Sequence, residues 1–300
     1  MLLFSGSSNP SLAKKIAKSM DLGLSNLEIV TFPDKENRVR VIDNVVEQKV
    51  VVVQSTGVSP NRYYMELFFI LDSIKRSGAE FVELVIPYLG YQRQDHIFRD
   101  GEGVSLEVII KIIESLGVSR VISFDLHSVR IPELFNIPVA HLSALPVFAE
   151  KIKEMFPDLS GVTLVSPDKG GIARIEKLSG LLGGLSYASI NKNRDLHTGE
   201  VESSRIDGNV SETAILVDDV ISTGGTLIAA TDLLKKNGVK KVYVFATHGI
   251  FAGVAPQKLQ QSGIEKVIVT DSVEIRANHK FEKLEVISIA PLITLELKQI

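Results

Sequence analysis

The sequence predicts an α/β fold in two related domains, each built on a mostly parallel β-sheet flanked by helices. Short runs of β-branched residues alternate with helical patterns along the 300-residue chain, which is the order expected of βαβ units. The runs are nearly continuous in apolar character, as in sheets covered on both faces. In addition, VVVVQSTG (50–57) resembles ILVDDVISTGG (215–225), because each is an apolar run followed by Ser-Thr-Gly and a helical pattern. This short match is the only internal sign that the domains are related.

The predicted strands share a short length, β-branched or aromatic enrichment and a polar or glycine-containing boundary. They span residues 2–4, 27–31, 38–42, 50–54, 82–87, 120–127, 162–168, 214–219, 241–248, 265–271 and 284–289.

The predicted helices carry apolar residues every three or four positions. In the segment 64–78, Leu67, Ile70 and Ile74 fall on one face, and Gly78 ends the pattern. Further helices are predicted over 104–117 and 226–238, each of which also ends at a glycine. We place the domain boundary after residue 142, so that one domain spans 1–142 and the other 143–284, with 285–300 joining the first domain.

Composition narrows the classes of function. The formal net charge of −3 argues against a nucleic-acid scaffold, which needs a basic surplus or stripe. The sequence has no cysteine, which excludes disulfides, thiolate catalysis and Cys-based zinc sites. The opening MLLFSGSSNP lacks the basic region of a signal peptide, and no run approaches the ~18 apolar residues of a membrane span. We expect a cytoplasmic protein with no nucleic-acid or membrane partner.

The segment DDVISTGGT (218–226) has the features of a phosphate-binding loop. Residues Ser222 to Thr226 offer backbone N–H groups, hydroxyls and glycines, and the following helix adds its positive end. The Walker pattern G-x-x-x-x-G-K is absent. Asp218 and Asp219 only accept hydrogen bonds when ionised, and they suit sugar hydroxyls or hydrated Mg²⁺. A phosphorylated pentose has a phosphate for the loop and hydroxyls for the two acids. The alternative is an ordinary strand–turn–helix with solvated acids, which would not need so many small residues and glycines.

Three further polar segments follow predicted strands, where ligands bind in open parallel sheets. RQDH (93–96) offers a guanidinium for a phosphate or base. SFDLH (123–127) places an Asp and a His two residues apart on one face, and SPDKGG (166–171) follows another strand. NKNRDLHTGEV (191–201) is a polar segment of mixed charge. Taken alone, each also fits a solvated turn or loop, so the functional interpretation depends on their combination.

Together these segments resemble the ribose-phosphate pyrophosphokinase family, whose product is phosphoribosyl pyrophosphate (PRPP). DDVISTGGT resembles the PRPP-binding loop of the type I phosphoribosyltransferase fold, and PYLGYQRQD resembles the family segment PYxxYxRQD. The other family-like segments are FSGSSNPSLA (4–13), FPDKE (32–36), DLH, SPDKGG, the K-x-R spacing at 192–194 and ATHGIF (246–251). The resemblance implies two phosphoribosyltransferase-like domains, with ATP on the first and ribose 5-phosphate on the second.

The resemblance also implies roles for particular residues and Mg²⁺ as a cofactor. The implied ATP-binding residues are Phe32, Asp34, Lys35, Glu36, Arg93, Gln94, Asp95 and His127. Those implied for ribose 5-phosphate are Asp218, Asp219, Ser222, Thr223, Gly224, Gly225 and Thr226. Lys192 and Arg194 would be catalytic cations on a closing loop, and His127 and Asp168 would bind the metal. Because FPDKE reaches ATP across a subunit interface in the family, self-association to at least a dimer is expected.

Several positions depart from the common family pattern. Ser222 stands where many members carry Asp, His96 stands where RQDKK has Lys, and Val46 stands where the allosterically regulated class has Arg. The first of these, and the segment FRDGEGVS (98–105), resemble the short archaeal-type members. Control by phosphate and ADP is therefore not implied. A PRPP-consuming phosphoribosyltransferase and a non-catalytic regulatory homologue stay open as alternatives.

Overall fold

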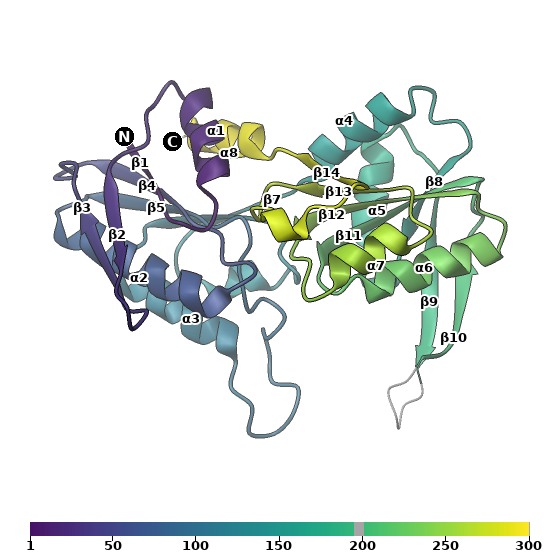
Figure 1. The fold of residues 1–300 in the computed structure, drawn as a ribbon, viewed down its shortest axis with the longest axis horizontal. Helices are drawn as coiled ribbons and strands as arrows, with labels where there is room; N and C mark the ends of the chain where they lie inside the picture. Colours follow the sequence, from purple (N-terminus) through teal and green to yellow (C-terminus); the bar gives the residue numbers. More distant parts are fainter. Residues whose placement is uncertain (195–200, 300) are drawn as a thin grey trace. The chain divides into compact units, whose positions relative to one another are not determined.

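The chain folds into two compact units, each with its own sheet. A computed structural model describes the backbone of residues 1–194 and 201–299, and the side chains of the same residues except 192–204. Unit 1 comprises residues 1–143, 272–274 and 288–300, and unit 2 comprises residues 144–271 and 275–287. Both units have mostly parallel sheets with helices beside them, so the predicted α/β class is confirmed (Figure 1).

Unit 1 contains a five-stranded parallel sheet in the order β1-β4-β5-β6-β7. These strands are Leu2–Ser5, Lys49–Val53, Phe81–Val85, Arg120–Phe124 and Val139–Leu142. Strands β2 (Leu27–Thr31) and β3 (Asn37–Val41) form a separate antiparallel hairpin. The helices are α1 (Pro10–Ser19), α2 (Pro60–Arg76), α3 (Ser105–Ser115) and α8 (Ala290–Leu297), with a 3₁₀ turn at Ile131–Leu134. Strand β7 was not predicted, because its four residues are only partly apolar.

Helix α2 shows why the predicted helical face forms. Its residues Leu67, Ile70 and Ile74 are fully buried and pack against strand residues such as Val50 and Leu84. The three side chains lie on one face because helical neighbours are three or four residues apart. Burying each of them stabilises the unit by roughly 1.5–3 kcal/mol relative to leaving it in water.

The C-terminal residues return to unit 1. Helix α8 lies beside α1 (Figure 1). Glu296 of α8 pairs with Arg120 of β6, whose Nη1 also lies 2.7 Å from Oε1 of the buried Glu83. Burial raises the pKa of Glu83, and the positive charge of Arg120 opposes that shift. This ion-pair chain connects the C-terminal helix to the centre of the sheet.

Unit 2 contains a seven-stranded sheet in the order β10-β9-β8-β11-β12-β13-β14. In chain order, β8 to β14 are Val162–Ser166, Tyr187–Arg194, Val201–Asp207, Thr213–Ile221, Lys241–Gly249, Lys266–Thr270 and Leu284–Ile287. All neighbours are parallel except β9 and β10. Its helices are α4 (Leu145–Met155), α5 (Ile172–Leu181), α6 (Gly225–Lys236) and α7 (Ala255–Gln261), with 3₁₀ turns at Lys169–Gly171 and Ala277–His279.

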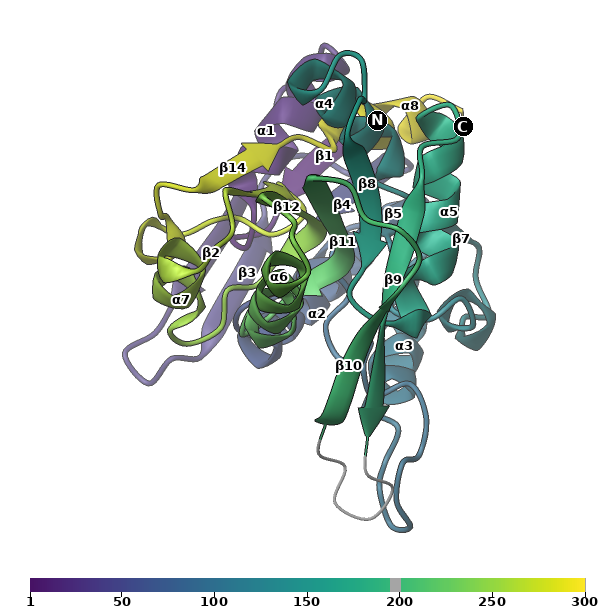
Figure 2. The same ribbon diagram turned by 90° about the vertical axis from the view of Figure 1, so that its right-hand side faces the viewer.

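Two segments of unit 2 differ from their sequence-based expectations. The segment 191–201 fits a polar loop by composition, but β9 continues to Arg194 and β10 begins at Val201. The two strands extend from the sheet as an antiparallel ribbon (Figure 2), which satisfies their backbone hydrogen bonds without an apolar pattern. The sequence places the return to the first domain at residue 285, whereas β14 pairs with β13 and unit 1 takes residues 288–300.

Across the described residues, no helix combines the length and apolar character needed to cross a bilayer.

Candidate active site

The loop after β11 has a backbone conformation suited to binding an anion. Strand β11 ends at Ile221, and α6 begins at Gly225. Gly224 between them has a left-handed backbone with φ of +76°, and a Cβ there would meet the Leu259 side chain at 3.2 Å. This conformation turns the chain sharply into α6, whose first N–H groups have no partner within the helix. Thr223, Gly225 and Thr226 are exposed at this helix start.

The hydroxyls of this loop are available to a ligand, in contrast to the similar loop in unit 1. Among the described residues, the side chains of Ser222, Thr223 and Thr226 form no hydrogen bond. In QSTG (54–57), by contrast, Ser55 Oγ donates to the Ser272 carbonyl at 2.7 Å and Thr56 Oγ1 accepts from Gly90 N at 2.7 Å. The first loop is therefore internally satisfied, and the second is open.

Asp218 and Asp219 lie at the end of β11 with one cation between them. Arg174 of α5 has Nη1 3.4 Å from Asp218 Oδ1 and Nη2 3.6 Å from Asp219 Oδ1. Asp219 N also donates to Asp218 Oδ1 at 2.9 Å. Burial, together with the hydrogen bond and charge of Asp219, raises the pKa of Asp218 to about 8, although Arg174 opposes the shift. Near neutral pH this pair can therefore both accept and donate hydrogen bonds to sugar hydroxyls.

Asp168 lies in the tight turn that follows β8. Its Oδ1 accepts from Gly171 N at 3.2 Å, and its carbonyl accepts from Ser166 Oγ at 2.6 Å. A Cβ on Gly171 would come within 2.4 Å of Ser166 Oγ, so the turn requires glycine there. Asp168 itself is exposed, which leaves carboxylate lone pairs for a ligand.

In unit 1, the RQDH and DLH segments line one pocket of about 800 Å³. The lining residues are Arg93, Asp95, His96, Phe98, His127, Ser128, Arg130, Ile131, Glu133 and Leu134. The buried Gln92 joins the two segments, because its Oε1 accepts from His127 N at 3.0 Å. Neither Arg93 nor Arg130 is paired with a carboxylate of the described part of the chain, so the pocket presents two uncompensated guanidinium groups to an anion.

Not every predicted nucleotide-binding residue lines this pocket. Gln94 turns toward the start of α3, where its Oε1 accepts from Ser105 Oγ at 2.7 Å. Lys35 and Glu36 instead line a separate pocket of about 840 Å³ between the β2–β3 hairpin and α2. Asp34 Oδ1 accepts from Glu36 N at 3.1 Å, which shapes the hairpin tip. Phe32 at the same tip is 39% exposed.

Some predicted site residues cannot be compared directly. The side chains of Lys192 and Arg194 lie outside the described residues, although both positions belong to β9. His127 belongs to unit 1 and Asp168 to unit 2, so each is described only within its own unit. Where side chains are described, no group of three or more His, Asp or Glu residues is arranged around a metal position.

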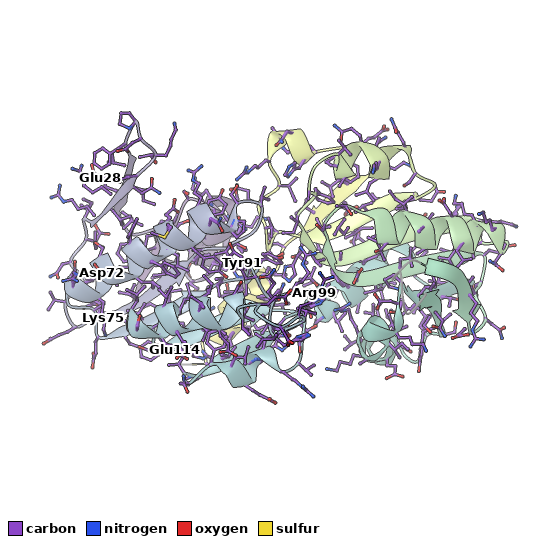
Figure 3. The ribbon with its side chains drawn as sticks, turned by 90° about the horizontal axis from the view of Figure 1, so that it is seen from below. Glu28, Asp72, Lys75, Tyr91, Arg99 and Glu114 are labelled. Atoms are coloured by element: carbon purple, nitrogen blue, oxygen red, sulfur yellow. The ribbon has the colours of Figure 1, made fainter. Side chains whose placement is uncertain are left out.

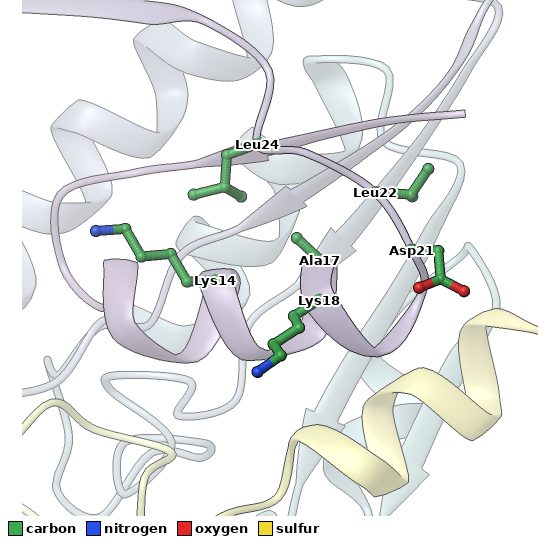
Figure 4. A pocket seen from close by; sticks show the side chains of 6 residues that line it. All are labelled: Lys14, Ala17, Lys18, Asp21, Leu22 and Leu24. Atoms are coloured by element: carbon green, nitrogen blue, oxygen red, sulfur yellow. The ribbon is translucent and has the colours of Figure 1, made fainter.

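A third hollow of about 510 Å³ lies beside α1 and contains none of the predicted site residues (Figure 4). The exposed Lys14 and Lys18 of α1 line it together with Leu22 and Leu24. Both lysines are exposed, and the hollow offers no buried polar group to orient a ligand. It therefore offers fewer groups for ligand binding than the loop after β11 or the unit 1 pocket that contains Arg93.

Sequence reasoning missed two residues that position the site. Arg174 was missed because a single arginine on a predicted helix gives no sign that it reaches the end of another strand. Gln92 was missed because a glutamine beside an arginine in PYLGYQRQD has no distinctive local pattern. Both contacts join segments more than thirty residues apart in sequence, 44 between Arg174 and Asp218 and 35 between Gln92 and His127.

Comparisons with known proteins agree with the motifs. The model of the N-terminal domain of ribose phosphate pyrophosphokinase matches residues 1–117, and that of the phosphoribosyl synthetase-associated domain matches residues 200–300. Ribose-phosphate pyrophosphokinase of Aquifex aeolicus is 40% identical over 97% of this chain and 93% of its own length. The enzyme of Bacillus caldolyticus is 36% identical over 97% and 91%. The crystal structure of phosphoribosylpyrophosphate synthetase from Mycobacterium smegmatis has a TM-score of 0.92 and 34% identity, covering 99% of this chain and 97% of that one.

Proposed function

Because the chain belongs to the ribose-phosphate pyrophosphokinase family, we propose that it transfers the β,γ-diphosphoryl group of MgATP to ribose 5-phosphate. The anomeric hydroxyl of the sugar attacks the β-phosphorus, and the bond from that phosphorus to the α–β bridging oxygen breaks. AMP leaves with the bridging oxygen, the hydroxyl proton is released, and PRPP forms. Such chemistry depends on positioning and charge stabilisation more than on covalent catalysis.

The sugar phosphate would be held by unit 2. The open hydroxyls and helix start at Ser222 to Thr226 support binding of its 5-phosphate. Asp218 and Asp219 would exchange hydrogen bonds with the 2- and 3-hydroxyls. The pair can both donate and accept, because Asp218 is largely protonated when the pH lies below its pKa of about 8. Arg174 would hold both carboxylates in place as a positioning residue.

The nucleotide would be held by the pocket of unit 1. Its unpaired Arg93 and Arg130 would contact phosphate oxygens, with Asp95 and His127 on the same walls. Phe32, Asp34, Lys35 and Glu36 do not line this pocket in their own subunit, which is compatible with a contribution from a second copy. We therefore include self-association and a shared ATP site in the proposal. Gln94 could contact the nucleotide only after its side chain breaks the hydrogen bond with Ser105.

Magnesium fits the donors that the chain offers. Mg²⁺ usually keeps several waters and binds through one or two carboxylates together with substrate phosphates, so a closed protein cage is not needed. The exposed carboxylate of Asp168 is a hard oxygen donor of that kind, and His127 could contact the ion through a water. When bound, the ion would neutralise charge on the transferring phosphates.

Lys192 and Arg194 are the proposed cations of the transition state. Losing one preorganised contact of this type costs roughly 3–4 kcal/mol of barrier, which is about a hundredfold or more in rate. Lys192→Ala should therefore abolish AMP release while ribose 5-phosphate still binds. Full activity of that variant would refute the assigned role.

The observation that carries the proposal is the open Ser-Thr-Gly-Gly loop beside the Asp218–Asp219 pair, within a chain related to these enzymes over almost its whole length. The decisive experiment incubates the purified chain with ATP, Mg²⁺ and ribose 5-phosphate and separates the products by chromatography. Equal amounts of AMP and PRPP are expected, and excess chelator should stop both. Consumption of PRPP with a free base, and no AMP from ATP, would instead identify a phosphoribosyltransferase.

A further inference from the structure

We infer that His141 and Ser143, at the end of β7, are positioning residues that hold the DLH segment so that His127 faces the unit 1 pocket. The inference rests on the proposed function, because it assumes that His127 contributes to binding of MgATP in that pocket. It assigns a role to two residues that lie outside all the motifs described above.

The backbone of the DLH segment turns sharply at Asp125. Strand β6 ends at Phe124, and the next residue, Asp125, is buried and has a left-handed backbone with φ of +33°. Residues with a Cβ rarely adopt this conformation, and it persists only where the surrounding contacts enforce it. After the turn, Leu126 is buried, whereas His127 is exposed and lines the pocket. The direction of His127 therefore depends on whatever holds this turn.

Three consecutive residues at the end of β7 hold the turn. The Leu142 carbonyl accepts from Asp125 N at 2.9 Å. Ser143 Oγ donates to Asp125 Oδ1 at 2.8 Å, and His141 Nε2 accepts from Leu126 N at 2.9 Å. The two side chains are two residues apart along the chain, as expected of groups that reach the same neighbour from one face of a strand. The turn is thus fixed through its backbone and through its own side chain.

The hydrogen bond to His141 lies next to the one that Gln92 makes. The consecutive N–H groups of Leu126 and His127 each donate to a side chain from another segment, because Gln92 Oε1 accepts from His127 N at 3.0 Å. Both N–H groups lie beyond the last paired residues of β6 and β7, so the sheet itself does not fix them. Outer contacts that orient a metal-binding residue commonly change affinity tenfold or more when they are lost. His141 therefore has the position of such a contact for His127.

The connection between the DLH segment and β7 also provides a matched control. His141→Leu removes the acceptor for Leu126 N, whereas His141→Gln keeps a side-chain oxygen that can accept. Ser143→Ala removes the second contact. Asn136 belongs to the same connection, but its Nδ2 donates to Oε2 of Glu114 on α3 at 2.9 Å (Glu114 is labelled in Figure 3). Asn136→Ala therefore removes a hydrogen bond of this region without touching the turn.

The test measures the dissociation constant of the full chain for MgATP by titration calorimetry. His141→Leu and Ser143→Ala should each raise this constant about tenfold. His141→Gln and Asn136→Ala should match the parent chain. The decisive comparison introduces His141→Leu into a His127→Ala background, where it should cause no further loss, because His141 acts through His127.

Several results would overturn the inference. Losses that multiply in the double variant, or an equal loss in His141→Gln, would indicate a general effect on unit 1. Parental affinity in both His141→Leu and Ser143→Ala would show that the turn does not need these contacts. If His141→Leu fails to fold, the same cycle with Ser143→Ala and His127→Ala decides the question. A parent chain that does not bind MgATP would reject the proposed function as well, whereas binding without this coupling would reject the inference alone.

Discussion

Arg174 Nη1 lies 3.4 Å from Asp218 Oδ1, while its Nη2 lies 3.6 Å from Asp219 Oδ1, so one guanidinium serves two adjacent carboxylates. Arg174 comes from α5 and the two acids from β11, and all three side chains are mostly buried. The arrangement sets one positive charge against two carboxyl groups, and burial together with Asp219 favours the protonated form of Asp218. This explains how a loop suited to phosphate can lie beside two acids.

Replacing Arg174 should therefore destabilise the fold and weaken sugar-phosphate binding. Arg174→Ala leaves two neighbouring carboxylates without their cation, and we expect a loss of about 1–2 kcal/mol in the free energy of unfolding near pH 7.5. Urea titration measures this loss. Arg205→Ala is the control in the same unit, because Arg205 pairs with Asp207 at 2.9 Å but is 73% exposed, and such surface pairs contribute little. Equal losses in the two variants would contradict the assignment.

The raised pKa of Asp218 makes stability depend on pH in a defined direction. A carboxyl whose folded-state pKa is near 8, above its ordinary value of 3.8, binds more protons in the folded than in the unfolded state between those values. Its contribution to stability is complete below about pH 4 and is lost as pH rises toward 8. Asp218→Asn removes this titration, so its unfolding free energy should fall less between pH 5 and 8 than that of the parent chain.

Thermal unfolding across that pH range gives the comparison for Asp218→Asn. Asp232→Asn is a suitable control, since Asp232 is an exposed acid on α6 in the same unit. Its pH profile should follow that of the parent chain. Identical slopes for all three proteins would show that Asp218 is not the group responsible.

Strands and helices with a local apolar pattern could be predicted from the sequence, whereas features that depend on contacts between distant segments could not. The apolar run at 214–219 and the helical period at 64–78 correspond to β11 and α2, because both patterns follow directly from which face is buried. The ribbon of β9 and β10 has no such pattern, since it is held by backbone pairing. The raised pKa of Asp218 comes mainly from its burial, which the DD pair alone does not reveal, and Arg174, which opposes the shift, lies 44 residues away.

The two glycines of the phosphate loop should respond differently to alanine. Gly224 has φ of +76° and a blocked Cβ position, so Gly224→Ala should cost about 1–2 kcal/mol of stability. At Gly225, the nearest atom to a new Cβ would be Thr223 Oγ1 at 3.8 Å, which is ordinary contact. Gly225→Ala should keep its stability but lose ribose 5-phosphate affinity, because the phosphate would approach that backbone. If calorimetry shows that Gly225→Ala binds ribose 5-phosphate as strongly as the parent chain, this loop does not bind the phosphate.

Replacing Gln92 should weaken the use of ATP and leave the binding of ribose 5-phosphate unchanged. It is 1% exposed, and its Oε1 accepts from His127 N at 3.0 Å, so Gln92→Met removes this buried hydrogen bond between the two segments and should loosen the DLH segment. We expect KM for ATP to rise about tenfold, while the dissociation constant for ribose 5-phosphate stays constant because the residues proposed to bind it lie in unit 2. Gln48→Met, at an exposed glutamine of unit 1, serves as the control and should change neither quantity. If Gln92→Met weakened both ligands equally, its effect would be a general loss of folding and not a displacement of His127.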